Sequence, residues 1–212
     1  MKKAVLILTV VTGLSLTSKA QELSSFKKKD LFLEGNFNTT INNDNDFGHK
    51  RTIVNFNPKV GAFVADKFAL GLKFNVSSDA SKINNFHYGQ SSVNINYYGI
   101  GVFGRYYFLE LGNRFKTYTE IGGNYSSGKR KRSGTNLEVS NKLHNYNLDA
   151  TIGANYFLTN RIAINFAFAN IIGFNSSKDD GLGGNSINSF HVNLNNFNNF
   201  FQSAQFGLTF KI

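Results

Sequence analysis

The 212-residue chain contains no cysteine and no tryptophan, and it has only one proline and one methionine. Without cysteine, neither disulfides nor thiolate metal sites can hold the fold together. Beyond the first twenty residues, glycine, asparagine or charge interrupts every apolar run before it reaches the length of a transmembrane helix. What is abundant is phenylalanine (22 residues), glycine (20 residues) and asparagine. Aromatic residues suit pleated strands, whereas glycine and asparagine suit turns, so we expect an all-β domain.

The chain is basic, with a formal net charge of +10 at pH 7. A basic balance fits either nucleic acid or an anionic membrane surface as a partner. No RRM, KH or zinc-finger motif can be read in the sequence, so we expect no nucleic-acid partner.

The N-terminus is typical of an export signal. Lys2 and Lys3 precede an apolar segment from Ala4 to Leu16, and Ser18 and Ala20 place small residues at the −3 and −1 positions of a cleavage site. The alternative, a transmembrane anchor helix, needs about 20 apolar residues, which this segment does not reach. We therefore expect a cleaved signal peptide at 1–20 and one domain at 21–212. No cysteine follows the cleavage site, so a lipoprotein is not expected.

Alternation of apolar and polar residues predicts eight strands in the mature chain. They are Leu31–Asn38, Val54–Val64, Phe68–Ser77, Ser92–Phe108, Phe115–Tyr125, Asn147–Tyr156, Ile162–Ala169 and Gln205–Ile212. Within Ser92–Phe108 the apolar residues change parity, which a β-bulge near Tyr98 and Gly99 would explain. Most of these strands are about 10 residues or longer, enough for a tilted strand to cross a bilayer.

The predicted connections alternate in length. Those near 65–67, 109–114 and 158–161 are short, whereas those near 41–51, 78–91, 127–144 and 172–198 are long and polar. Short turns at one end and long loops at the other are typical of outer-membrane barrels, with the turns and both chain ends in the periplasm.

Alternation alone does not say which face of the barrel is apolar, but three features favour an apolar exterior. The polar face carries small residues that fit a narrow interior: Gly61, Gly71, Gly122, Gly153, Ala163, Ala167 and Gly207. Aromatic residues near strand ends resemble an interfacial girdle: Phe63, Phe68, Tyr106, Tyr107, Phe108, Phe115, Tyr156 and Phe157. The last strand ends at Ile212 and has the form of a barrel-assembly signal, with Gln205, Gly207, Phe210 and Ile212 at its marker positions.

The chain resembles the small outer-membrane β-barrels of the OmpA and OmpX type, often labelled "porin family". The matching stretches are Pro58–Asp66, Leu70–Leu72, Phe103–Phe108, Glu120–Gly122 and Gly153–Thr159. The resemblance implies an eight-stranded antiparallel up-and-down transmembrane β-barrel in the outer membrane of a Gram-negative bacterium. Its partners would be outer-membrane lipid, lipopolysaccharide and, during biogenesis, the barrel-assembly machinery. The chain has no room after Ile212 for a peptidoglycan-binding domain, so we expect no cell-wall anchor.

Seven charged residues are predicted to face the barrel interior: Glu34, Lys59, Lys73, Arg105, Lys116, Glu120 and Asp149. An eight-stranded barrel is just wide enough for side chains to fill it, and buried charges must be paired. We therefore expect an ion-pair network centred on Arg105 and Glu120, with Lys59, Glu34 and Asp149 nearby. Such a network would close the barrel; a gated ion or water path is the alternative.

Four further motifs indicate a function only weakly. Gly99–Gly104 matches GxGxxG but lies inside a strand, where a dinucleotide site does not form. Asp44–Gly48 and Asp179–Gly181 faintly resemble calcium loops, yet the first lacks its final glutamate. Lys129–Arg132 can contact lipopolysaccharide phosphates or simply be solvated. The histidines fall one in or beside each long loop, which favours unrelated loop residues over a metal site: His49, His87, His144 and His191.

No catalytic constellation and no cofactor site can be read, so we expect no enzyme. The leading hypothesis is a structural or surface-interaction barrel with at most minor passive permeability. A small-solute porin is the second hypothesis. A soluble lipocalin-like small-molecule binder is the third, and it requires the apolar face to point inward. The surface partner cannot be named from the sequence.

Overall fold

The computed structural model describes residues 26–44, 48–85, 89–134, 137–181, 185–192 and 205–212. Within these ranges the elements are β-strands, and no helix there is long and apolar enough to cross a membrane. The strands are β1 Leu31–Asp44, β2 His49–Ala65, β3 Phe68–Asn85, β4 Gly89–Leu111, β5 Phe115–Gly134, β6 Leu137–Phe157, β7 Ile162–Asp179, β8 Ser186–Val192 and β9 Gln205–Lys211. The predicted signal peptide, 1–20, lies outside the described residues.

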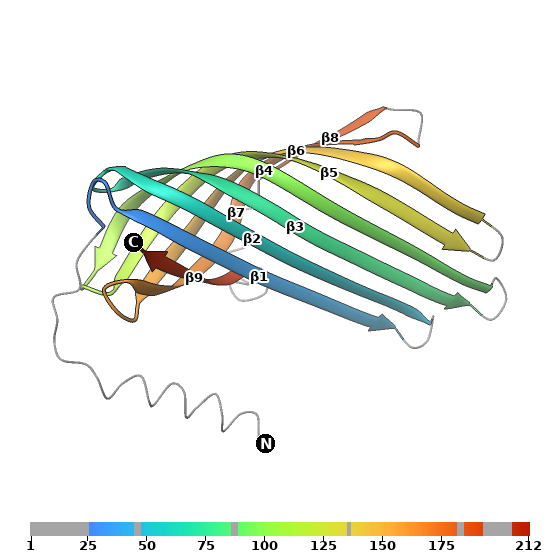
Figure 1. Cartoon of the computed structure of the whole chain (residues 1–212), viewed down its shortest axis with the longest axis horizontal. Helices are drawn as coiled ribbons and strands as arrows, with labels where there is room; N and C mark the ends of the chain where they lie inside the picture. The colour runs from blue at the N-terminus through green and yellow to red at the C-terminus, as the bar shows by residue number, and fades with distance from the viewer. Residues whose placement is uncertain (1–25, 45–47, 86–88, 135–136, 182–184, 193–204) are drawn as a thin grey trace, which may run out of the picture.

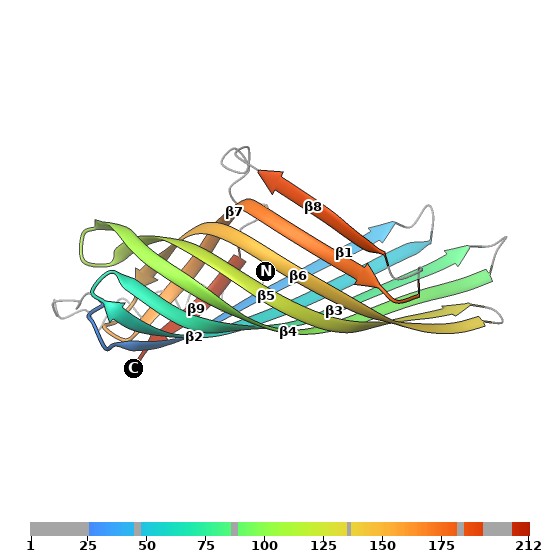
Figure 2. The ribbon, with the colours of Figure 1, turned by 90° about the horizontal axis from the view of Figure 1, so that it is seen from above.

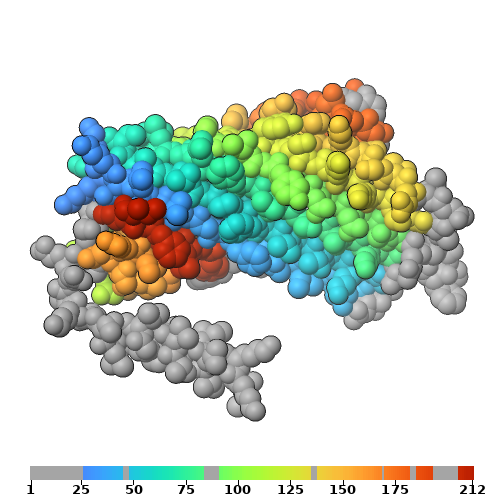
Figure 3. Space-filling view, viewed as in Figure 1, coloured from blue at the N-terminus to red at the C-terminus, as the bar shows by residue number. Residues whose placement is uncertain are grey.

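The strands form an antiparallel meander that returns to its start (Figure 1). β1 to β7 pair consecutively, β7 pairs with β9, and β9 pairs with β1 between Phe32↔Lys211 and Phe37↔Phe206. In the space-filling view β9 lies directly beside β1 (Figure 3). The predicted all-β, eight-stranded, antiparallel up-and-down barrel is therefore confirmed as a ring of eight strands.

Two strands share the eighth position of the ring. β9 pairs with the first part of β7, Ile162–Ala167, whereas β8 pairs with its second part, Ile172–Lys178. All of β8 pairs with β7, and it lies along the outer side of that strand (Figure 2). The sequence pattern predicts β9 but misses β8, because β8 is exposed to solvent along its whole length and has no buried face to impose alternation.

The predicted long loops are wrong for most of their length. Strands run through 41–44, 78–85, 127–134 and 172–179, and β8 occupies 186–192. We call the end with the connections 66–67, 112–114 and 158–161 the turn end, and the opposite end the hairpin end. At the hairpin end the outward face of the strands is mostly polar and the inward face mixes polar and apolar residues, so the alternation that identifies a strand weakens although the pairing continues.

The predicted bulge near Tyr98 and Gly99 is also wrong. β4 pairs without interruption there, and its irregularity lies between Tyr107 and Leu109. Along β4 the inward-facing Ile95 and Tyr97 are half-buried, while Asn96, which faces outward, is exposed. The parity change in the sequence therefore marks the point where the exterior of the barrel turns from apolar to polar.

The exterior carries a continuous apolar band from the turn end to the middle of the strands. On β3 it runs from Phe68 to Val76, close to the length of about 9 to 11 residues that a tilted strand needs to cross a bilayer. Beyond the band the outward residues are polar, with Ile41 as an exception: Thr52, Ser78, Asn96, Ser127, His144 and Ser176. An exposed apolar band around an interior that holds buried charges does not fit a soluble lipocalin-like binder, which needs an apolar interior and a polar exterior.

The interior is fitted by pairing large side chains with glycine on the neighbouring strand. Phe32 lies opposite Gly61, Phe103 opposite Gly71, and Tyr118 opposite Gly153. A Cβ atom on Gly61 or Gly153 would lie 2.4 Å from the facing ring, so these positions admit no larger residue without displacement of that ring. The small residues on the polar face thus make room for aromatic rings inside the barrel.

We expect Leu72→Arg, in the middle of the apolar band, to destabilise the folded barrel by about 2–4 kcal/mol. Ser78→Arg, on the same face of the same strand but beyond the band, is the matched control and should cost less than about 1 kcal/mol. Denaturant titrations of both variants in lipid vesicles measure the difference. Equal effects at the two positions would contradict the membrane-facing band.

Candidate functional site

The core of the site is a buried ion network around Arg105 on β4. Its guanidinium donates to Glu34 on β1, with Nη1–Oε2 2.7 Å and Nη2–Oε1 2.8 Å. It also donates to Glu120 on β5, with Nε–Oε2 2.8 Å and Nη2–Oε2 2.5 Å. Lys59 on β2 donates to Glu120 at 2.6 Å and lies 3.6 Å from Glu34. Four strands thus meet at one pair of carboxylates, and Arg105 has no solvent exposure.

Neutral groups complete the hydrogen bonding of this network. Glu34 accepts from the Thr209 hydroxyl at 3.0 Å, and Thr209 accepts from Asn155 at 2.8 Å. Asn155 in turn accepts from the Tyr107 hydroxyl at 3.1 Å. The Arg105 guanidinium also lies 4.0 Å from the centroid of the Tyr118 ring, a favourable cation–π distance. A buried network is stabilising only when its polar groups are satisfied in this way.

An aromatic cluster fills the barrel between the network and the turn end. Phe26, which precedes β1, stacks on Phe63 at 4.4 Å and contacts Tyr107 and Phe157 at 5.1 Å each. Phe32 adjoins the same cluster, and all five rings are buried. The cluster and the ion network together occupy the barrel interior over the half nearest the turn end.

This cluster corrects the predicted aromatic girdle. Phe63, Tyr107 and Phe157 point inward and are buried, whereas Phe68, Tyr106, Phe108 and Tyr156 are exposed on the outside. Near a strand end both faces carry aromatic residues. Composition alone therefore does not distinguish the outward-facing rings of an interfacial girdle from the inward-facing rings that fill the barrel. Phe26 is missed by sequence reasoning altogether, because it lies before the first alternating segment.

The other predicted interior charges pair separately from the network. Lys73 donates to Asp149 at 2.6 Å, so Asp149 belongs to a second ion pair rather than to the Arg105 cluster. Lys116 is buried and pairs with Glu110 at 2.9 Å near the turn end. With Glu110, the seven predicted residues comprise four cations and four anions, all of them in ion pairs.

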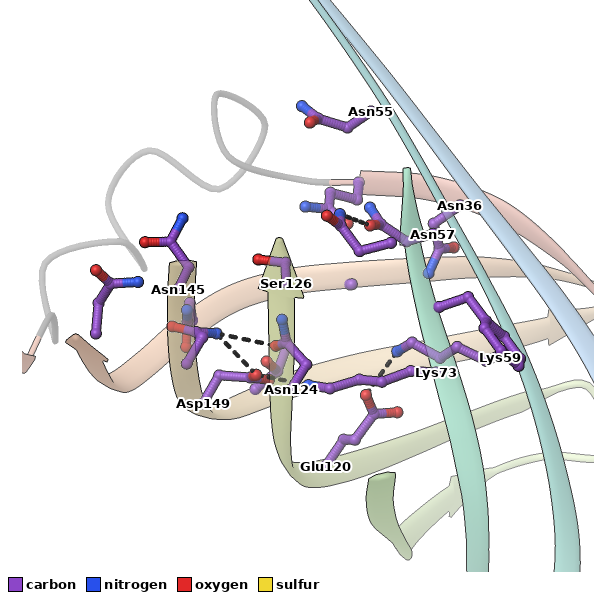
Figure 4. Close-up of a pocket in the computed structure, with 18 residues that line it drawn as sticks. Asn36, Asn55, Asn57, Lys59, Lys73, Glu120, Asn124, Ser126, Asn145 and Asp149 are labelled. Atoms are coloured by element: carbon purple, nitrogen blue, oxygen red, sulfur yellow. Dashed lines mark hydrogen bonds and ion pairs between the residues drawn. The ribbon is translucent and has the colours of Figure 1, made fainter. Parts of the chain in front are cut away.

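A polar cavity of about 470 Å³ lies on the hairpin side of the ion network (Figure 4). Lys59 and Glu120 line it next to the network, and Lys73 and Asp149 line its wall. The remaining lining is mostly amide and hydroxyl groups: Asn36, Asn55, Asn57, Asn75, Asn124, Ser126, Asn145, Asn147, Thr151, Asn170, Asn175 and Gln205. Many of these pair with one another, as Asn75 does with Asn57 at 2.6 Å. The cavity is thus a polar recess against a filled half-barrel.

The four weaker sequence motifs lie on strands or in ordinary ion pairs wherever the structure describes them. Gly99–Gly104 lies within β4, inside the ring, as expected for a motif without a cofactor role. Among the predicted calcium-loop residues, Asp179 pairs with Arg130, and Asp180 lies 3.7 Å from His144. His49, His144 and His191 lie on strands rather than in loops, and His87 lies outside the described residues. Across the described part of the chain, no group of three or more His, Asp or Glu residues can hold a metal ion.

No protein-family model and no curated protein sequence matches the chain. Among solved structures, the outer membrane protein OprG from Pseudomonas aeruginosa is similar with a TM-score of 0.52 and 16% identity, over 89% of this chain and 98% of that chain. Ail of Yersinia pestis has a TM-score of 0.43 and 10% identity, over 87% of this chain and 99% of that chain. The N-terminal β-barrel domain of Pseudomonas aeruginosa OprF has a TM-score of 0.40 and 10% identity, over 87% of this chain and 98% of that chain.

The likeness to OprG is a likeness of fold. This chain therefore has the fold of the small outer-membrane β-barrels. The predicted resemblance is confirmed at that level.

Removing the central cation of the network should be strongly destabilising. Arg105→Met leaves Glu34 and Glu120 sharing only Lys59, and we expect a loss of about 3–5 kcal/mol in the free energy of unfolding. Arg105→Met/Glu34→Gln restores one cation to one carboxylate and should recover part of that loss. Denaturant titrations in lipid vesicles measure both variants. A double variant no more stable than Arg105→Met would contradict the charge-balance explanation.

Proposed function

We propose that the protein is an integral outer-membrane barrel with a structural or surface-interaction role and at most minor passive permeability. The observation that carries this proposal is the filled half-barrel: the Arg105 network and the aromatic cluster around Phe26 lie between the polar recess and the turn end. An eight-stranded barrel has little interior to spare, so a packed layer of rings and paired charges stops solute flow. The proposal includes no catalytic role and no cofactor.

The membrane placement is supported by the apolar band and by the strand ends. The turn end, where β9 ends, faces the periplasm in this proposal, and the hairpin end projects outside the cell. Gln205, Gly207, Phe210 and Ile212 act as the signal to the barrel-assembly machinery; Phe210 is outward-facing and exposed, so the apolar side of β9 is open to recognition. Export through a signal peptide at 1–20 precedes this step.

The small-solute porin remains the second candidate, and the polar recess is the observation in its favour. Its amide-rich walls are those of a water-filled vestibule. A porin needs that vestibule to continue through the barrel to the turn end. Lys59, Glu120 and the buried Arg105 lie in the way of such a channel.

Single-channel recordings in planar bilayers separate the two candidates. We expect the wild type to show no sustained open state, because the network and the rings block the interior. Arg105→Ala should raise the conductance, since it removes the largest fully buried side chain of the plug. The matched control is Arg130→Ala: this arginine pairs with Asp179 in the hairpin half, and its loss should leave the conductance unchanged. A large, persistent pore in the wild type would refute the sealed barrel.

Localisation is tested by membrane fractionation and by heat-modifiable mobility on gels. We expect the chain in the outer-membrane fraction and a shift in apparent size between unheated and boiled samples, because a closed barrel resists detergent until it is heated. Recovery in the soluble periplasmic fraction without such a shift would overturn the membrane placement.

A further inference from the structure

The outward face of β5, β6 and β7 carries a group of cations just beyond the apolar band. Lys129 on β5 lies directly opposite Lys142 on β6, and His144 on β6 lies opposite Lys178 on β7. Lys131 occupies the next outward position on β5. We call Lys129, Lys131, Lys142 and Lys178 the lysine ridge; all four are exposed.

The structure divides the basic run Lys129–Arg132 between two faces. Arg130 points into the barrel and pairs with Asp179, whereas Lys129 and Lys131 point outward. The run therefore does not act as one block in a loop. The outward half joins lysines from two other strands, which are distant in sequence and cannot be grouped with it from the sequence alone.

The pairing of Lys129 with Lys142 is unfavourable on its own. Directly opposed side chains in an antiparallel pair have Cβ atoms about 4.5–5.5 Å apart, and like charges there destabilise the sheet. The acidic residues on this face are Asp180, which lies 3.7 Å from His144, and Glu138, which is further toward the hairpin end. Among the described residues of this face, two acidic side chains stand against four lysines, so the ridge has an excess of positive charge that an external anion would balance.

The ridge lies at the height of a membrane surface. Tyr125 and Tyr146 face each other at the edge of the apolar band, with ring centroids 5.0 Å apart and Tyr146 largely exposed. Tyrosines at this level are typical of the membrane–water interface. His144 and then Lys142 follow Tyr146 outward on β6, two residues apart at each step, which is about 7 Å along the strand. Lys142 therefore lies about 13 Å beyond Tyr146 along the strand, and its long side chain can bend back toward the headgroup layer.

We propose that the lysine ridge binds the phosphate groups of an outer-leaflet lipid of the lipid A type. The inference rests on the membrane placement proposed above. A lipid supplies both features that the surface offers: phosphates for the opposed lysines and acyl chains for the apolar band directly beneath them. The lysine ammonium groups donate to the phosphate oxygens, and Tyr125 and Tyr146 pack at the level between headgroup and chains.

The test uses the full mature barrel in phosphatidylcholine nanodiscs with added lipid A, either carrying its phosphates or enzymatically dephosphorylated. Native mass spectrometry measures how much of each lipid is retained on the protein. We expect retention of phosphorylated lipid A only. Lys129→Gln/Lys142→Gln should weaken it by about tenfold or more, as expected for the loss of charge-assisted contacts, and Lys129→Arg/Lys142→Arg should retain it.

Lys28→Gln/Lys67→Gln is the matched control, since it removes two exposed lysines at the turn end and should leave retention unchanged. Heat-modifiable mobility verifies that each variant is folded. Equal retention of the two lipids, or retention unaffected by Lys129→Gln/Lys142→Gln, would overturn the proposal. So would inorganic phosphate that binds the ridge as tightly as the lipid does. Because outer-membrane fractionation is scored separately, failure here is distinguishable from failure of the membrane placement.

Discussion

The structure depends on burying Arg105 without leaving its charge uncompensated. Desolvation of a buried ion costs several kcal/mol even after relaxation, and only well-placed partners offset it. Its carboxylate partners come from two other strands, Glu34 from β1 and Glu120 from β5. Lys59 from β2 pairs with Glu120 and supplies the second positive charge for the two carboxylates. Thr209 of β9 adds a hydrogen bond to Glu34 across the seam where the first and last strands meet. The charge network is therefore complete only when the ring is closed, so electrostatics and topology stabilise the same state.

The size of the interior imposes a second constraint, which the glycine positions meet. Eight strands leave space only for side chains, so each large inward group needs a small neighbour. Phe32, Phe103 and Tyr118 have glycine directly across the pair, and they surround the Arg105 guanidinium at 5.2, 5.5 and 4.0 Å. Glycine has a low propensity for strands, yet these glycines allow the aromatic rings to enclose the buried cation. The same side chains therefore both pack the interior and surround the Arg105 charge.

Period-two alternation predicts much of this from sequence, because parity alone decides which face a strand residue occupies. Arg105, Glu120, Glu34 and Lys59 share the inward parity of their strands, and the structure brings them together. Parity says nothing of height along the barrel, so it does not separate the Lys73–Asp149 pair from the network. It fails where polar residues or glycine occupy both faces for several positions, which is why the strands at 127–134 and 172–179 are predicted as loops. It also fails for Phe26, which has no strand to give it a parity.

The barrel has two halves that are stabilised differently, and the boundary lies where the exterior turns polar. On the turn-end side the interior is packed with rings and paired charges, so a change at the network disturbs the fold. On the hairpin side, the extended hairpins are held by inward pairs such as Arg51 with Asp79 at 2.6 Å and Arg130 with Asp179, not by an apolar core. The Arg51–Asp79 pair is partly exposed and contributes little to stability, whereas Asp179 is buried in its pair with Arg130. Rigid strands present the outward lysines at fixed spacing, and a ligand that binds them does not have to order a loop first. In the proposed function, recognition at the surface of the hairpin half can therefore change without disturbing the packing of the turn-end half.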